Sequence, residues 1–109
     1  MAWKVKFFQT ARGDYPVKEF IDEQNPMIRS KIALSILLLK NQGPFLKPPY
    51  IKKLQDKLYE LRISGTTQIR IFYTIYHSEY YLLSAFSKKT QKTPNKELKI
   101  AVDRMKKIV

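Results

Sequence analysis

Three short runs of β-branched, aromatic and aliphatic residues follow one another closely in the second half of the chain. They constrain the fold more than any other feature, and they span Leu58 to Ile63, Gln68 to Tyr76 and Tyr80 to Phe86. Only a few residues connect each run to the next, whereas a parallel pair of strands needs a crossover of a dozen residues or more. We therefore predict an antiparallel meander of three strands.

The rest of the chain predicts segments that join or cover this sheet. They are, in order, a strand over residues 3–8, a short helix from Pro16, a longer helix from Pro26 through Lys40, an irregular basic connection over 44–57, and a last helix after Pro94. Proline after a capping residue marks the start of each helix, and Gly43-Pro44 ends the second one. A length of 109 residues fits one domain, 1–109, of the α+β class.

The helix expected from Pro26 is densely apolar. Its larger aliphatic side chains are Ile28, Ile32, Leu34, Ile36, Leu38 and Leu39. They follow one another too closely for a one-sided stripe, and a helix that is apolar on most of its circumference is usually buried. We interpret this segment as the main layer that covers the sheet.

Positive charge indicates the class of partner. The chain carries 21 Lys and Arg against 9 Asp and Glu, a net charge of +12 with a pI near 10.0. Fourteen of the basic but only five of the acidic side chains follow residue 43, in the half that forms the meander. Such an excess predicts a polyanionic partner, most often nucleic acid. The alternative is a basic surface that only maintains solubility.

Several classes of protein are disfavoured. The absence of cysteine excludes a disulfide framework and a thiolate metal site. The nine carboxylates and one histidine show no metal-binding spacing, and the three glycines form no phosphate loop, so we expect no cofactor. The longest apolar run, Ile32 to Leu39, is too short to span a bilayer, and the first residues lack a signal-peptide pattern. We expect a cytoplasmic protein without membrane contact.

Alternation along the strands sorts their side chains into two faces. The apolar sets are Tyr59, Leu61 and Ile63 in the first strand and Ile69, Ile71, Tyr73 and Ile75 in the second. We expect these sets to form the core face. Glu60, Arg62 and Arg70 then share the opposite face, near one another if the two strands pair. The third strand ends on Lys88 and Lys89 and delivers both to one end of the sheet.

Arginines on a sheet face suit an RNA ligand. A guanidinium group binds phosphate through two hydrogen bonds, and the neighbouring ring of Phe72 or Tyr76 could stack on an unpaired base. The alternative is an ion pair of Glu60 with Arg62 or Arg70 on the surface, which would contribute little to stability. The pattern alone leaves both interpretations open.

Three segments are quite specific when they are taken together. They read Leu58-Tyr59-Glu60-Leu61-Arg62, Ile69-Arg70-Ile71-Phe72-Tyr73 and Phe86-Ser87-Lys88-Lys89-Thr90-Gln91-Lys92-Thr93-Pro94. With these segments and the order of its elements, the chain resembles the HigB-type toxins of the RelE superfamily over almost its whole length. The resemblance implies a RelE-like fold with a small antiparallel sheet, two N-terminal helices packed on it and a C-terminal helix.

The resemblance also implies an activity and partners. Members of this family are toxins of type II toxin–antitoxin systems that cleave messenger RNA, typically on the ribosome. They act without a metal ion, by attack of a 2′-hydroxyl on the adjacent phosphate. A co-encoded antitoxin, often a HigA-like helix-turn-helix protein, binds the toxin and neutralises it. Operator DNA would be contacted only through that antitoxin.

Residue roles are carried over from the family motifs by position. Arg70 is expected to bind the scissile phosphate with help from Arg62. One of Lys88 and Lys89 is expected to act as the general acid and the other as a phosphate contact. Gln91 and Lys92 occupy the region where the family places a terminal tyrosine or histidine, and we expect them to contact RNA.

The general base is left open by the resemblance. Some relatives carry lysine on the strand where this chain has Glu60. The role therefore falls either to Glu60 or to one of the basic residues just before it, Lys52, Lys53 or Lys57, which we otherwise expect to contact RNA.

Two further functions remain as alternatives to catalysis. The chain could be a non-catalytic module that binds RNA or the ribosome through Arg62, Arg70 and Lys88. It could also serve mainly as a corepressor that acts with a DNA-binding partner.

Overall fold

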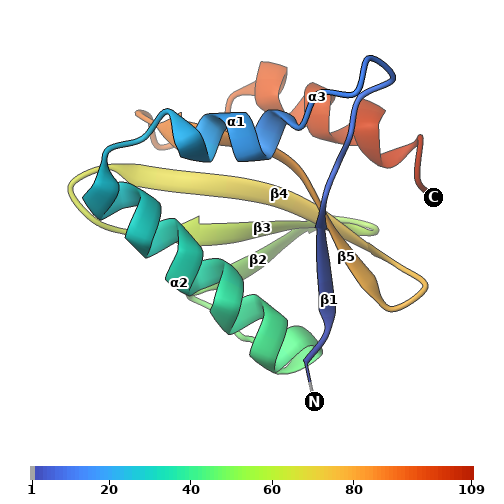
Figure 1. Ribbon diagram of the computed structural model, residues 1–109, viewed down its shortest axis with the longest axis horizontal. Coiled ribbons are helices and arrows are strands. Elements are labelled where there is room, and N and C mark those ends of the chain that lie inside the picture. Colours follow the sequence, from blue (N-terminus) through green and yellow to red (C-terminus); the bar gives the residue numbers. More distant parts are fainter. Residues whose placement is uncertain (1) are drawn as a thin grey trace.

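The computed structural model describes residues 2–109 (Figure 1). Its elements are, in chain order, β1 (Lys4–Phe7), α1 (Pro16–Asp22), α2 (Pro26–Gln42), the 3₁₀ turn η1 (Gly43–Phe45), β2 (Ile51–Gln55), β3 (Leu58–Ile63), β4 (Gln68–Tyr76), β5 (Glu79–Lys88) and α3 (Asn95–Met105). Helices and a single sheet occupy separate stretches of the chain, which confirms the predicted α+β class.

The sheet has five strands in the order β1-β5-β4-β3-β2. Strands β3, β4 and β5 pair antiparallel with their sequence neighbours, so the predicted meander is confirmed. Strand β1 joins it, as expected, but it pairs in parallel with β5, which makes the sheet mixed rather than antiparallel throughout. Figure 1 shows β1 at the edge of the sheet beside β5.

The basic connection contains a strand that the sequence did not predict. Residues Ile51–Gln55 form β2, which pairs antiparallel with β3, so the expectation of an irregular segment over all of 44–57 is wrong. Its exposed lysines, Lys52 and Lys53, lie on an outer strand. Lysine is common there because its charge discourages pairing with another chain.

The two faces of the sheet carry separate apolar clusters. On one face α1 and α2 pack over Leu61, Ile71 and Tyr73, which belong to the predicted core face. On the other face α3 packs over Phe72 and Leu83. Figure 1 shows α2 and α3 separated by the strands. The face opposite the predicted core is therefore only partly open to solvent, since α3 covers much of β4 and β5.

Helix α2 begins and ends as its sequence predicts, but it is not buried all round. The Asn25 side chain accepts a hydrogen bond from the backbone N–H of Ile28 at 2.9 Å, which satisfies one of the free amides of the first turn. Ile32 and Leu39 are fully buried. Leu34 is 66% exposed, so its interpretation as a core residue is wrong, and it lies on an outer face with Met27 and Leu37.

Helix α3 is attached to the sheet by packing and by one side chain. Ala101 is fully buried, which lets the helix approach the strands closely. The Arg104 guanidinium donates a hydrogen bond to the backbone carbonyl of Leu83 at 2.8 Å and lies over the Phe8 ring. Of the helices in residues 2–109, none is long and apolar enough to cross a membrane.

The end of α2 depends on a glycine. Gly43 has φ +50°, and a Cβ there would lie between 2.5 and 2.8 Å from ring atoms of Trp3. Gly43→Ala should therefore lower the free energy of unfolding by about 1–3 kcal/mol more than the strain of a positive φ alone. Urea unfolding followed by circular dichroism measures this. Gly13→Ala is the control, because φ is +96° there and the nearest atom lies 3.7 Å away. Equal losses in the two variants would contradict the packing argument.

Candidate active site

The register between β3 and β4 places two arginines directly opposite each other. Arg62 is the Cα partner of Arg70, and Glu60 is the partner of Phe72. Glu60 and Arg62 share one face because they stand two residues apart on β3. Arg70 shares that face because it pairs directly with Arg62. Like charges in facing positions repel, so this arrangement needs a counter-charge nearby.

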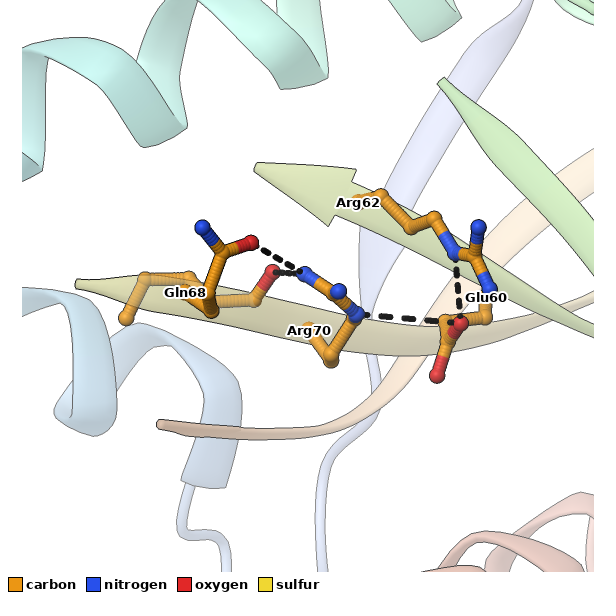
Figure 2. A network of polar contacts seen from close by, with 5 residues as sticks. Glu60, Arg62, Gln68 and Arg70 are labelled. Atoms are coloured by element: carbon orange, nitrogen blue, oxygen red, sulfur yellow. Dashed lines mark hydrogen bonds and ion pairs between the residues drawn. The ribbon is translucent and has the colours of Figure 1, made fainter. Parts of the chain in front are cut away.

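Glu60 provides that counter-charge from a buried position. Its side chain is only 1% exposed, and its Oε1 atom lies 3.0 Å from Nε of Arg62 and 3.8 Å from Nε of Arg70. Figure 2 shows both guanidinium groups turned toward this one carboxylate. The predicted ion pairs thus exist, but the alternative of a weak surface pair does not describe them, because the carboxylate is excluded from water.

Arg70 is held on both sides. One of its terminal nitrogens donates to the backbone carbonyl of Ile69 at 3.1 Å and to Oε1 of Gln68 at 3.4 Å. In Figure 2 the guanidinium lies between Gln68 on one side and Glu60 on the other. Burial lowers the pKa of Arg70, while Glu60 raises it and Arg62 lowers it again. Arginine remains protonated in proteins, so Arg70 is a fixed cation in a defined orientation.

Two buried polar atoms of this cluster lack a hydrogen bond within residues 2–109. They are Oε2 of Glu60 and Nε of Arg70. A buried polar group without a partner costs about 1–3 kcal/mol. The cluster is therefore not the most stable way to fill this part of the sheet, and such departures from full satisfaction are concentrated at functional sites.

A pocket of about 460 Å³ opens beside Arg70. It is lined by Gln68, Arg70, Lys88, Lys89, Thr90 and Gln91. The pairing of Gln68 with Lys88 brings the end of β5 next to the start of β4. Within the described residues neither Lys88 nor Lys89 lies within ion-pair distance of a carboxylate. The pocket is thus lined by three cations, two of which have no counter-charge, and it suits an anionic ligand.

Most of the residues predicted for the site are brought together here. Glu60, Arg62 and Arg70 form the cluster, while Lys88, Lys89 and Gln91 line the pocket beside it. Lys92 is exposed on the same connection and does not line the pocket. Lys52 is the Cα partner of Glu60 on β2, so it adjoins the cluster from the outer strand.

Three further predicted residues do not line the pocket. Phe72 is fully buried beneath α3, so the expectation that its ring stacks on an RNA base is wrong. Lys53 points to the other face of β2, where its amine lies 6.0 Å from the centre of the Tyr59 ring. Lys57 occupies the turn before β3, five residues from Arg62, which is about 16 Å along an extended strand.

Sequence reasoning missed Gln68 as a site residue. Its side chain contacts Arg70 and lines the pocket. The signal was present, because Gln68 stands two residues before Arg70 and so lies on the same face of β4. No group of three or more His, Cys, Asp or Glu side chains that could hold a metal ion occurs within residues 2–109.

A comparison with protein families identifies the family of this chain. Residues 19–106 match the family described as Phage derived protein Gp49-like (DUF891). The chain belongs to the Gp49-like family. This is a toxin-like family of the RelE and HigB type, and the five-stranded α+β structure is consistent with a RelE-like fold. A search of curated proteins found no match. The family extends over β2 to β5 and therefore over the whole cationic cluster of the Gp49-like chain.

The buried carboxylate should be essential for the stability of this cluster. Glu60→Gln removes the negative charge that offsets the repulsion between Arg62 and Arg70, and loss of one partner of a buried pair is expected to cost about 3 kcal/mol. Urea unfolding measures the loss. The control is Asp103→Asn on α3, whose pair with Lys99 is exposed at 3.6 Å and should contribute under about 0.5 kcal/mol. A Glu60→Gln protein as stable as wild type would contradict the proposed counter-charge.

Proposed function

We propose that this Gp49-like chain is the toxin of a type II toxin–antitoxin system and an endoribonuclease that cleaves messenger RNA on the ribosome. Family membership is consistent with a toxin of such a system. The observation that carries the proposal is the orientation of Arg70, held by Glu60 and Gln68 beside a pocket that Lys88 and Lys89 line. An oriented guanidinium with further cations around a cavity suits the stabilisation of charge on a reacting phosphate.

The reaction that fits this site is a transesterification carried out by side chains. The 2′-hydroxyl of one nucleotide attacks the adjacent phosphorus, and the bond to the 5′-oxygen of the next nucleotide breaks. The products are a 2′,3′-cyclic phosphate and a 5′-hydroxyl. Negative charge accumulates on the phosphate oxygens in the transition state, and prepositioned cations stabilise it without having to reorganise.

Arg70 and Arg62 have different parts in this proposal. Arg70 contacts the scissile phosphate from the wall of the pocket. Arg62 is more exposed, with 30% of its side chain open to solvent, and it assists from the neighbouring strand. Glu60 is too deeply buried to reach a ribose hydroxyl directly, so we interpret it as a positioning residue that orients both guanidinium groups.

In this proposal lysines act as both the general acid and the general base. Lys88 and Lys89 line the pocket, and one of them protonates the leaving 5′-oxygen while the other contacts the phosphate. Among the three lysines considered for the general base, Lys52 is the one that the register places on the face of the arginines. We therefore propose Lys52 as the base.

The proposal includes a protein partner. An active ribonuclease must be held inactive in its own cell, so we propose a co-encoded antitoxin of the helix-turn-helix type that forms a complex with this chain. Operator DNA would be bound through that antitoxin. Since its substrate lies on the ribosome, the toxin would act in the cytoplasm.

Arg70 is the most direct test of the active site. Expression of Arg70→Ala in a bacterial cell should abolish the growth arrest that wild type causes, with cleavage of messenger RNA reduced about 10²- to 10³-fold, because the transition state loses its fixed cation. Primer extension on cellular RNA measures the cleavage. Arg70→Lys keeps the charge but not the planar fork and should retain intermediate activity.

Lys4→Ala is the control for Arg70→Ala, because Lys4 lies on β1 with a 77% exposed side chain and forms only a 3.8 Å pair with Glu79. It should arrest growth as wild type does. A folded Arg70→Ala protein that still arrests growth would exclude Arg70 from the active site. A wild-type protein that binds RNA without cutting it would instead support a non-catalytic binding module.

Lys52 and Lys53 form a matched pair for the general base, since they are adjacent on β2 but face opposite sides of the sheet. Lys52→Ala should lower kcat by about 10²-fold or more, as expected for loss of a general base. Lys53→Ala should change kcat by less than about threefold, because a surface lysine contributes only to electrostatic attraction. Steady-state cleavage of messenger RNA on programmed ribosomes gives kcat for both variants. Equal values of kcat in the two variants would show that Lys52 is not the general base.

A further inference from the structure

A second groove is lined in part by Arg62. It has a volume of about 470 Å³, and its lining includes Lys31 and Leu34 of α2, Pro49 and Tyr50 before β2, and Arg62 of β3. A groove of this size is within the usual range for sites that hold small ligands. None of its residues except Arg62 belongs to the catalytic cluster described above.

Tyr50 lines this groove, and its backbone is held by β3. The backbone N–H of Arg62 donates to the carbonyl of Tyr50 at 2.8 Å, which continues the pairing of β2 with β3 by one residue. The Tyr50 side chain remains 53% exposed. An aromatic ring that is anchored through its backbone but open to solvent can stack on a flat ligand at little cost in conformational entropy.

The charged side chains that line the groove are both cations. Lys31 extends from α2 toward the turn between β3 and β4. Its amine lies only 2.7 Å from the place that a Cβ on Gly65 would occupy. Arg62 approaches from β3 and keeps 30% of its side chain exposed while its Nε binds Glu60. The lining also has an apolar part, which includes Leu34, Pro49 and Ile63.

We propose that this groove binds the nucleotide next to the scissile phosphate of the RNA substrate. The base stacks on Tyr50 beside the apolar part of the lining, and the phosphate of that nucleotide contacts Lys31 and Arg62. Arg62 lines the groove and is the direct strand partner of Arg70, which lines the catalytic pocket, so one continuous strand of RNA can occupy both. This inference rests on the proposed ribonuclease function for the nature of its ligand.

Charge and continuity favour RNA over a protein in this groove. A second copy of the chain is disfavoured, since each copy carries a net charge of +12 and the cations of one groove would face those of the other. A partner protein would have to supply carboxylates at the positions of the phosphates, and it would not account for the link through Arg62 to the catalytic cluster.

Direct binding of a short RNA tests the groove. The probe is a fluorescein-labelled hexaribonucleotide with 2′-O-methyl groups throughout, which cannot be cleaved because the attacking hydroxyl is blocked. Anisotropy at low salt should show wild-type binding and a roughly 5- to 100-fold weaker affinity for Tyr50→Ala, the effect expected for loss of one stacked base. Tyr50→Phe retains the ring and should bind like wild type.

Tyr15→Ala is the control, because Tyr15 is also an exposed tyrosine but precedes α1 and does not line the groove. It should leave the affinity unchanged. Lys31→Ala should weaken binding and reduce its dependence on salt by about one phosphate contact.

The possible outcomes distinguish a failure of the proposed groove from a failure of the proposed ribonuclease function. If Tyr50→Ala binds the probe with unchanged affinity while Arg70→Ala is inactive in cleavage, RNA does not bind in the groove, but the ribonuclease function stands. The same follows if the wild-type protein cleaves messenger RNA but does not bind the probe. A wild-type protein that neither binds the probe nor cleaves RNA would overturn both. Loss of antitoxin binding by Tyr50→Ala, with RNA binding intact, would assign the groove to the protein partner instead.

Discussion

The contact of one buried carboxylate with two arginines is the interaction on which the site depends. Arg62 and Arg70 face each other across β3 and β4, a pairing that would be repulsive by itself. Oε1 of Glu60 lies within ion-pair distance of both, so the sheet can carry two cations side by side. Burial of a lone carboxylate would be costly in turn, so each charge makes the burial of the others tolerable.

The fold places this cluster on the face of the sheet that α3 covers only in part. Helices α1 and α2 pack on one face, and α3 packs on the other over β4 and β5. The cluster adjoins the end at which β4 begins and β5 ends, so the strand pairing delivers Lys88 and Lys89 to the same place. The rigid sheet therefore sets the relative positions of cations that are far apart in the sequence, which is what electrostatic catalysis requires.

Local patterns in the sequence predicted much of this arrangement. Short spacing between apolar runs predicted the meander, and period-two alternation placed Glu60, Arg62 and Arg70 on one face. The exposed or buried state of that face could not be read in the same way, because it depends on where α3 packs, which is a long-range contact. Phe72 was therefore expected to be open although α3 covers it. Strand β2 was missed because its lysines and preceding prolines resemble a loop, and its pairing with β3 comes from tertiary structure.

The chemical identity of the RNA ends tests the central claim most directly. A messenger RNA on programmed ribosomes is incubated with the purified protein, and the new ends are analysed together with those of an RNA that has a single 2′-deoxy nucleotide at the cleavage position. The site described here predicts a 2′,3′-cyclic phosphate and a 5′-hydroxyl, and no cleavage of the deoxy substrate at that position. Ends with a 5′-phosphate, cleavage of the deoxy substrate at that position, or intact RNA after incubation with folded wild-type protein would contradict it.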